Sequence, residues 1–117
     1  MILNKPSITT VDILGSSWVI KVETDNPEFE DCDGYIDYST RTIHIECMQN
    51  NKGLQEDLIA VEKKTVRHEI IHAFLFESGH HGNSLVYEHS WEGNEEMIDW
   101  WAIQFHKIEK VFKDLKV

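Results

Sequence analysis

The sequence predicts an α+β fold in which two helices pack against a small antiparallel sheet. In the first half of the chain, apolar and polar residues alternate with a period of two, as they do in strands. In the second half, apolar residues recur every three or four positions, as they do in amphipathic helices. Because the strands precede the helices, an antiparallel sheet is favoured over a parallel one. We expect residues 1–117 to form a single domain, since that length suits one core.

Four short strands are expected in the first half, grouped as two pairs. The first pair covers residues 8–14 and 18–23, which are rich in β-branched and aromatic residues and are separated by a Gly-Ser-Ser turn. The second pair covers residues 34–38 and 42–46 around a polar turn, which is the pattern of a hairpin. The apolar side chains that share one face of the second strand are Trp18, Ile20 and Val22.

Two helices are expected in the second half. The first helical stretch follows Gly53, as one long helix or as a short helix joined to a longer one. It ends near Gly79, because glycine readily adopts the left-handed backbone found after helix C-termini. A polar connection follows, and Asn94 is a good N-cap for the second helix, which starts at Glu95. Within the apolar stripe of this helix we expect Trp101 to lie in the core. The stripe comprises Ile98, Trp101, Phe105, Ile108, Phe112 and Leu115.

The composition excludes several classes of protein. Hydrophobic residues make up 41% and charged residues 27%, which is typical of a globular chain and not of a disordered one. The 21 Asp and Glu against 11 Lys and Arg give a net charge of −10, which disfavours a nucleic-acid partner. Residues 23–37 hold seven of these acids and no Lys or Arg, and we interpret them as a solvated acidic loop.

The sequence shows neither a signal peptide nor an apolar run long enough to cross a bilayer, so we expect no membrane partner and a cytoplasmic location. Cys32 and Cys47 form no CxxC pair, which excludes a cysteine-type zinc knuckle. In the cytoplasm both are expected to be reduced thiols. A disulfide between Cys32 and Cys47 stays open as the alternative.

The most informative motif is His68-Glu69-Ile70-Ile71-His72. On a helix, histidines four positions apart share one face, so both imidazoles can bind one metal ion, for which Zn²⁺ is the usual occupant. Glu69 is then placed to take a proton from a water that the metal activates, as in the HExxH motif. The alternative is a metal-free polar network inside a buried helix.

A catalytic zinc site takes three protein ligands, so a third must come from elsewhere in the chain. Glu95 and Asp99 lie four positions apart on the second predicted helix and share a face. Glu95 is the favoured ligand, and Asp99 is expected to accept the free ring N–H of His68 or His72. Leu75 stands where the metzincin motif needs a glycine, which excludes that class. Three histidines stay open as alternative ligands: His80, His81 and His89.

The HEIIH pentapeptide, followed by Asn94-Glu95-Glu96-Met97-Ile98-Asp99, resembles the gluzincin pattern, in which an NExxxD glutamate lies on the helix after HExxH. Over residues 34–106 the chain is similar to the ImmA/IrrE-type metallopeptidase group and to related short proteins of bacteria and their phages. The resemblance implies a zincin-like fold. It also implies His68, His72 and Glu95 as zinc ligands, Glu69 as the general base, and Asp99 as the partner of the first histidine.

These expectations describe a zinc-dependent peptidase that hydrolyses peptide bonds in a peptide or protein substrate, within a bacterial or phage-infected host cell. The residue that stabilises the oxyanion is expected to be Tyr87 or His89. The loop between the two motifs is short, and we expect no additional domain to supply a second cleft wall. The alternative is therefore a zinc-containing protein-binding module of a phage or mobile element, with little or no proteolytic activity.

Overall fold

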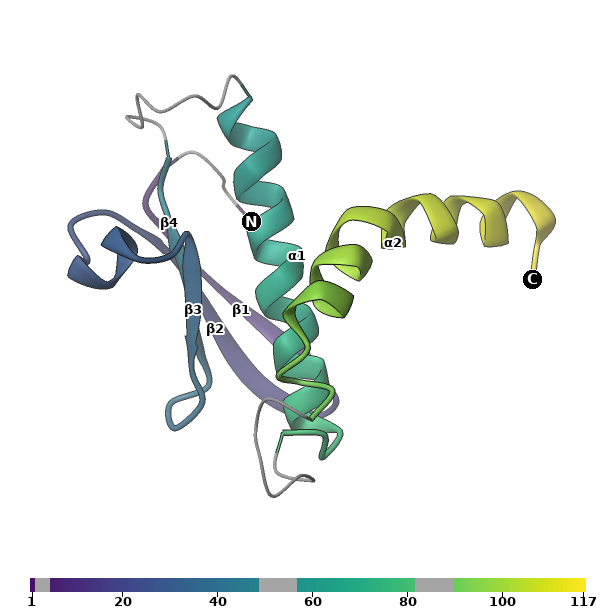
Figure 1. Ribbon diagram of the computed structural model, residues 1–117, viewed down its shortest axis with the longest axis horizontal. Coiled ribbons are helices and arrows are strands. Elements are labelled where there is room, and N and C mark those ends of the chain that lie inside the picture. Colours follow the sequence, from purple (N-terminus) through teal and green to yellow (C-terminus); the bar gives the residue numbers. More distant parts are fainter. Residues whose placement is uncertain (2–4, 49–56, 82–89) are drawn as a thin grey trace.

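The computed structural model describes residues 1, 5–48, 57–81 and 90–117. In these ranges the chain forms a four-stranded sheet and two long helices (Figure 1). The predicted α+β class is confirmed, and each predicted strand is present. The elements in chain order are β1 (Ser7–Ile13), β2 (Ser16–Glu23), the short 3₁₀ helix η1 (Pro27–Glu30), β3 (Gly34–Asp37), β4 (Thr42–Glu46), α1 (Leu58–Glu77) and α2 (Glu95–Leu115).

The sheet is mixed, so the expectation of a purely antiparallel sheet is wrong. Its strand order is β1-β2-β4-β3, with antiparallel pairs at both sides and a parallel pair, β2 with β4, at the centre. The reason is the long connection through η1, after which β3 runs back along the outer edge of the sheet. The strand that returns from it, β4, then enters beside β2 in the same direction. Each hairpin fixes its own pairing, but not how the two hairpins meet.

The core lies between the sheet and α1, which covers one face of it (Figure 1). The alternation expected in β2 is confirmed, because Trp18, Ile20 and Val22 are all buried. Ile43 and Ile45 of β4 extend the same face and are fully buried. Burial of apolar side chains such as these is the main favourable contribution to folding, at about 25 cal/mol per Å². The same packing fixes the position of α1, which carries the HExxH motif.

The carboxylate of Glu77, in the last turn of α1, ties this helix to both hairpins. The Trp18 indole donates to Glu77 Oε1 at 2.8 Å, and the Ser16 hydroxyl donates to Oε2 at 3.1 Å. The Arg41 guanidinium, from the turn between β3 and β4, donates to Oε1 at 2.6 Å. The hydrogen bond from Arg41 is the main reason why the pKa of Glu77 is lowered from its ordinary value.

The ends of α1 agree with the sequence where the structure describes them. The side chain of Asp57 caps the first turn by accepting from the backbone N–H of Ala60 at 2.9 Å. Gly79 follows the last turn with φ of 88°, so its predicted role at the C-terminus is confirmed. The predicted beginning of this helix, near Gly53, lies outside the described residues.

The second helix, α2, starts against α1 and then projects away from the body (Figure 1), so the expectation that both helices pack on the sheet is wrong for α2. The predicted N-cap is confirmed, because Asn94 Oδ1 accepts from the Met97 backbone N–H at 3.0 Å. Ile98 and Ala102 are buried against the body. Trp101, which we expected in the core, is 36% exposed, so that expectation is wrong. The helix leaves the body after its first turns, and the apolar stripe continues beyond the surface that could bury it.

Two further findings concern location and the cysteines. Within the described residues, neither helix combines the length and the apolar character that crossing a bilayer requires. Cys32 is partly exposed, Cys47 is buried, and both are free thiols, so the alternative of a disulfide between them is not what the structure has.

Candidate metal centre

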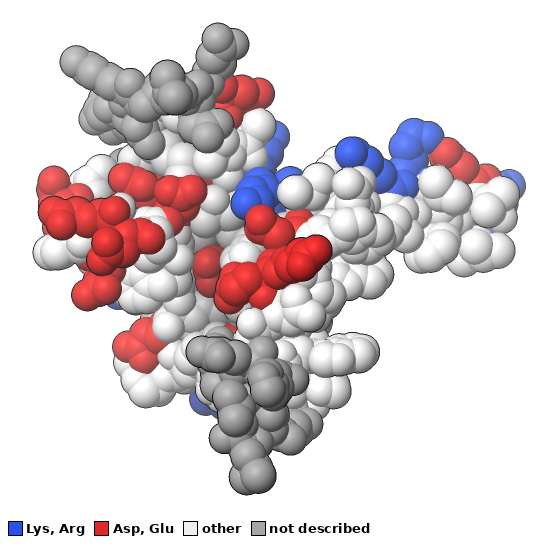
Figure 2. Space-filling model, in the orientation of Figure 1, with Lys and Arg blue, Asp and Glu red and all other residues white. Residues whose placement is uncertain are grey.

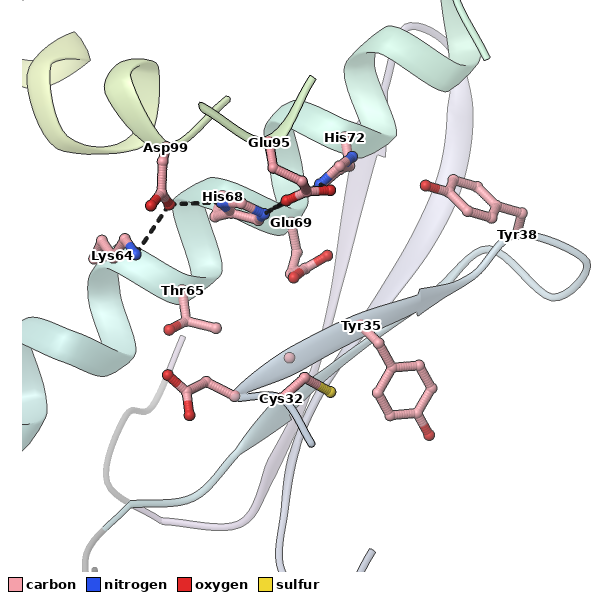
Figure 3. A pocket seen from close by; sticks show the side chains of 12 residues that line it. Cys32, Tyr35, Tyr38, Lys64, Thr65, His68, Glu69, His72, Glu95 and Asp99 are labelled. Atoms are coloured by element: carbon pink, nitrogen blue, oxygen red, sulfur yellow. Dashed lines mark hydrogen bonds and ion pairs between the residues drawn. The ribbon is translucent and has the colours of Figure 1, made fainter. Parts of the chain in front are cut away.

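His68 and His72 lie one turn apart on α1, on the side that faces the start of α2 (Figure 3). Their Nε2 atoms are 3.1 Å apart and point toward the same place. The helix fixes this arrangement, because residues four positions apart occupy neighbouring positions on one face. The packing of α1 on the sheet buries the His72 side and leaves His68 slightly more open.

The third member of the group is Glu95, from the first turn of α2. Its Oε2 lies 2.9 Å from His68 Nε2, and its Oε1 lies 3.1 Å from His72 Nε2. Two ligands of a tetrahedral zinc ion, at 2.0–2.1 Å each, lie about 3.4 Å apart, so these spacings are close to what the ion requires. The Glu95 side chain is 65% exposed, and the group therefore opens to solvent on one side.

Both histidines turn their other ring nitrogen, Nδ1, toward a carboxylate. His68 Nδ1 lies 2.9 Å from Asp99 Oδ1, and His72 Nδ1 lies 2.7 Å from Glu92 Oε1. An ionised carboxylate only accepts hydrogen bonds, so a ring nitrogen Nδ1 that faces one carries the proton, and a neutral ring then presents its lone pair at Nε2. Two lone pairs and the Glu95 carboxylate then face one another at 2.9–3.1 Å. Only a cation between them, a metal ion or a proton, makes this arrangement favourable.

The charges around His72 favour such a cation. Burial disfavours the charged form of the ring, but the hydrogen bond to Glu92 and the negative charges of Glu95 and Glu69 outweigh it and raise the His72 pKa above its ordinary value. Because the cause is an excess of negative charge, the same environment favours a divalent cation. Among the described residues, the donor set that could hold one is His68, His72 and Glu95.

Asp99 lies where the prediction places it, on the face of α2 that Glu95 shares. Besides accepting from His68, it accepts from Lys64 Nζ at 2.9 Å, so one carboxylate joins the histidine to a cation one turn earlier on α1 (Figure 3). Partial burial opposes ionisation of Asp99, but these two partners outweigh it and lower its pKa. An ionised Asp99 holds the His68 ring in one orientation and keeps its Nε2 free to bind a metal.

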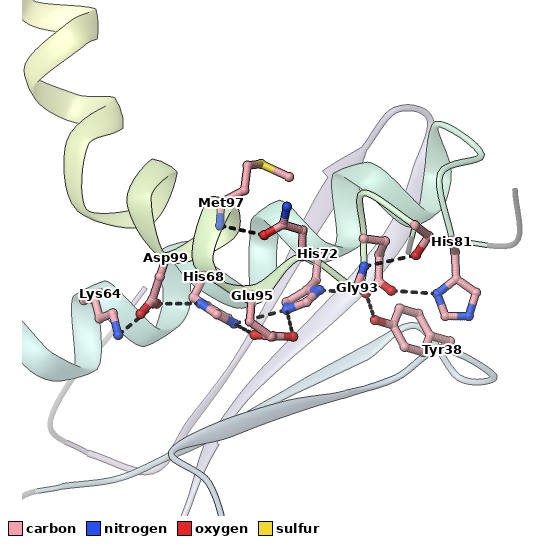
Figure 4. Close-up of polar contacts among 12 residues, drawn as sticks. Tyr38, Lys64, His68, His72, His81, Gly93, Glu95, Met97 and Asp99 are labelled. Atoms are coloured by element: carbon pink, nitrogen blue, oxygen red, sulfur yellow. Dashed lines mark hydrogen bonds and ion pairs between the residues drawn. The ribbon is translucent and has the colours of Figure 1, made fainter. Parts of the chain in front are cut away.

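Glu92 is the important residue that the sequence did not reveal. It is fully buried, and besides His72 it accepts from His81 Nδ1 at 2.9 Å and from the Tyr38 hydroxyl. Figure 4 labels the three donors, His72, His81 and Tyr38. The residue comes from an irregular turn before α2, which Ser90 and Gly93 close, so no helical spacing marks it. The one available signal was a carboxylate three positions before the predicted ligand Glu95.

The predicted general base, Glu69, lines a cleft of about 460 Å³ beside the three donor residues. Its side chain is 7% exposed. Burial is the main cause that raises its pKa to about 7; the charge of His72 lowers it, and Glu95 and Glu92 raise it further. A carboxylate whose pKa lies near neutrality can both take and return a proton at physiological pH.

The opposite wall of the cleft is the edge strand β3, which approaches α1 closely at Gly34. A Cβ atom at this position would lie 2.9 Å from the Thr65 side chain and 3.1 Å from the His44 carbonyl oxygen. The absence of a side chain at Gly34 therefore sets the width of the cleft. Cys32 and Tyr35 flank this point on the same wall (Figure 3).

Of the other predicted site residues, the alternative metal ligands and the candidates for oxyanion stabilisation, some lie in the described part of the chain and some do not. His81 contacts Glu92 and not the donor group, and His80 stacks on Trp91 with ring centres 5.2 Å apart, so neither is brought to the site as a third ligand. Tyr87 and His89, the candidates for oxyanion stabilisation, lie outside the described residues, and so does the alternative of His89 as a ligand.

Comparison of the chain with models of protein families, with curated proteins and with solved structures finds no match. The resemblance to gluzincins therefore stays a prediction that rests on the two motifs. What the structure adds is independent of it: the side chains named by those motifs meet at one place, next to a cleft.

Proposed function

We propose that the chain is a zinc-dependent peptidase of the minimal gluzincin type, with a zincin-like fold. The observation that carries the proposal is the convergence of three acceptors, the Nε2 atoms of His68 and His72 and the carboxylate of Glu95, within 2.9–3.1 Å of one another. Neutral imidazoles and a carboxylate are the ligand set typical of catalytic zinc, and the exposed side of Glu95 leaves room for a water or substrate.

His68, His72 and Glu95 would hold the metal in this proposal. Bound zinc supplies Lewis-acid chemistry, which makes a water molecule nucleophilic at neutral pH and polarises a carbonyl group. Glu69 takes one proton from the attacking water at its carboxylate and passes it to the nitrogen of the departing amine, while the C–N bond of the peptide breaks. The products are one carboxylate and one amine, so one water is consumed for each bond cleaved.

The substrate in this proposal is an extended peptide that lies along β3. In the described part of the chain this strand is hydrogen bonded to β4 on one side only, and its other edge borders the cleft. A peptide can add itself to such an edge through backbone hydrogen bonds. Gly34 and Tyr35 lie opposite Glu69 across the cleft, so a peptide on this edge passes the donor group. We place the activity in the cytoplasm, where Cys32 and Cys47 stay reduced.

A second candidate function is a zinc-containing protein-binding module of a phage or mobile element. The observation that favours it is the openness of the donor group, because the Glu95 side chain is 65% exposed. A donor group that is open to solvent excludes water less well from the reacting bond, which weakens electrostatic catalysis.

The test is metal analysis combined with cleavage of a peptide library. We expect one zinc ion per chain, and cleavage that a chelator abolishes and added zinc restores. Glu69→Gln should keep the zinc and lose at least about 10²-fold in rate. Glu96→Gln is the matched control, because Glu96 is the exposed neighbour of the ligand Glu95 and should leave both unchanged.

Each outcome separates the proposals. Absence of zinc binding on titration would overturn the peptidase and the binding module together. Stoichiometric zinc with no cleavage across the library would favour the binding module. Cleavage by Glu69→Gln at the wild-type rate would show that the assigned general base is wrong.

A further inference from the structure

The second half of α2 is a helix without a partner in the described chain. It projects from the body (Figure 1), and every side chain from residue 109 to residue 117 is exposed. Its apolar side chains include Phe112, 52% exposed, and Leu115, 67% exposed. A helical segment of this length is marginally stable in water when its apolar face packs on nothing.

The apolar stripe of α2 follows a heptad pattern, with spacings of three and four residues from Ile98 to Leu115. At the body, the same stripe runs into an apolar groove of about 520 Å³ between α1 and α2. Trp101 and Phe105 belong to both, so the stripe and the groove are one continuous surface. The groove walls on the α1 side include Ile71, Phe74 and Leu75.

The charges along α2 are segregated by sign. Up to residue 106 the helix carries Glu95, Glu96 and Asp99 and no Lys or Arg. From residue 107 onward the segment has four lysines, at 107, 110, 113 and 116, against two acids, at 109 and 114 (Figure 2). An antiparallel pair of such helices places each basic half beside an acidic half, whereas a parallel pair places like charges together.

We propose that two copies of this chain associate through α2 in an antiparallel, two-fold arrangement. The projecting half of each helix lies along the groove of the other copy, so that one surface is used twice. If the pairing is centred between Phe105 and Ile108, Phe112 lies beside Trp101 of the partner subunit. The projecting half of α2 is long enough to reach the groove of the other copy, because the seven residues from Phe105 to Phe112 span about 10 Å of helix.

The flanks of the stripe agree with this arrangement. At about 100° per residue, Lys113 and Lys116 lie on the same side of the stripe as Glu95 and Asp99. In a two-fold antiparallel pair of helices, the same side of the stripe in each copy faces its counterpart in the other copy. The two lysines of one copy therefore approach the acidic first turns of α2 in the other copy.

The surface available is close to what a stable dimer needs. Six apolar side chains of the stripe and the groove are partly exposed. Aromatic side chains cover about 150–250 Å² each, so full burial of these six would remove roughly 600 Å² of accessible surface per copy. With the polar rim added, the interface approaches the ~800 Å² per partner that is typical of specific complexes. The six are Phe74, Trp91, Trp101, Phe105, Phe112 and Leu115.

A membrane surface is the competing occupant, because a helix with an apolar face and several lysines can lie on anionic lipid. Two observations favour the second copy. The net charge of −10, with three acids at the start of α2, opposes approach to an anionic surface. The groove also continues the stripe as a concave surface, which fits a helix and not a flat bilayer.

Sedimentation equilibrium across a concentration series of the full chain, with zinc present, tests the proposal. We expect a monomer–dimer equilibrium that Phe112→Asp weakens at least about tenfold in Kd. Ile103→Asp is the matched control, since Ile103 is exposed but lies on the opposite side of α2, and it should leave the dimer unchanged. The double charge reversal K113E/K116E should weaken the dimer at low salt, with a smaller effect at high salt.

Circular dichroism of each variant confirms that it is folded. A wild-type chain that stays monomeric at all concentrations overturns the proposal, as does a dimer that survives Phe112→Asp. Binding to vesicles of anionic lipid is measured as a third test. If the chain is monomeric and binds the vesicles through Phe112, the stripe contacts a membrane, and the proposal of a second copy is overturned.

Discussion

The two histidines of the candidate metal centre are held by partners in opposite environments. His72 donates to Glu92, a fully buried carboxylate that two further side chains also contact. His68 donates to Asp99, which is 42% exposed and also forms an ion pair with Lys64. The chemistry of the two pairs is the same, but their surroundings differ. We infer that the Glu92 side contributes to the stability of the fold, whereas the Asp99 side would mainly affect how tightly the centre binds a metal.

The largest effect is expected from Glu92→Ala. Three side chains, those of Tyr38, His72 and His81, would lose the Glu92 carboxylate as a hydrogen-bond acceptor. Breaking a buried charged network by removing one partner typically costs about 3–5 kcal/mol. Chemical denaturation should show a loss of this size, and the zinc Kd, measured by competition with a chelator, should rise by more than tenfold. Wild-type stability in this variant would contradict the inferred structural role of Glu92.

A smaller and different effect is expected from Asp99→Asn. The amide keeps the shape and can still accept from His68, but it removes the negative charge that favours a cation bound at the other side of the ring. We expect the zinc Kd to rise about tenfold, while the free energy of unfolding without metal changes by less than about 1 kcal/mol. If this variant were destabilised as much as Glu92→Ala, the contrast between the two partners would not hold.

Glu77 offers a reference carboxylate on the same helix but outside the centre. Its hydrogen bond from Arg41 lowers the pKa of Glu77 below the ordinary value of 4.5. The ionised carboxylate therefore contributes to the free energy of unfolding above pH 4.5, and this contribution is lost as the pH falls through the folded-state pKa. Glu77→Gln should therefore cost about 1–2 kcal/mol at neutral pH, with a difference from wild type that shrinks in acid. A difference that stays constant down to pH 3 would contradict this account. Zinc binding should be unchanged.

The smallest effect is expected from Lys64→Gln. Lys64 contacts Asp99 at 2.9 Å, but both side chains are more than a third exposed, so solvent screens the pair. Such pairs contribute about 0–1 kcal/mol, and the zinc Kd should change by less than about fivefold. A larger change would indicate that Lys64, and not the Asp99 carboxylate alone, sets the orientation of the His68 ring.

Some parts of this molecule could be predicted from local sequence, and others could not. The spacing of His68 and His72 and the capping by Asn94 depend on residues within one or two turns, so pattern alone identifies them. The parallel meeting of β2 and β4 depends on how two hairpins assemble, which no single segment encodes. The role of Glu92 could not be predicted from the sequence, because its burial is created by packing around an irregular turn.

Trp101 shows the limit of the periodic pattern itself. Its position in the stripe correctly indicates an apolar face, but the pattern does not say where the body that could cover that face ends. The same stripe buries Ile98 and leaves Phe112 half exposed. Helical periodicity therefore identifies which side chains need a partner, and only the three-dimensional structure shows which of them have one within the chain.

The three donor residues come from two helices, α1 and α2, which are separated in the sequence by residues 78–94. An ion held by His68, His72 and Glu95 would thus act as a cross-link that closes the loop from residue 72 to residue 95. Unlike a disulfide, the ion would bind the folded chain and not the unfolded one, so it would stabilise the folded state by its binding free energy, reversibly with metal supply. The docking of α2 on α1 would then depend on the free zinc concentration, and chelation would release the helix that carries Glu95 before it unfolds the sheet.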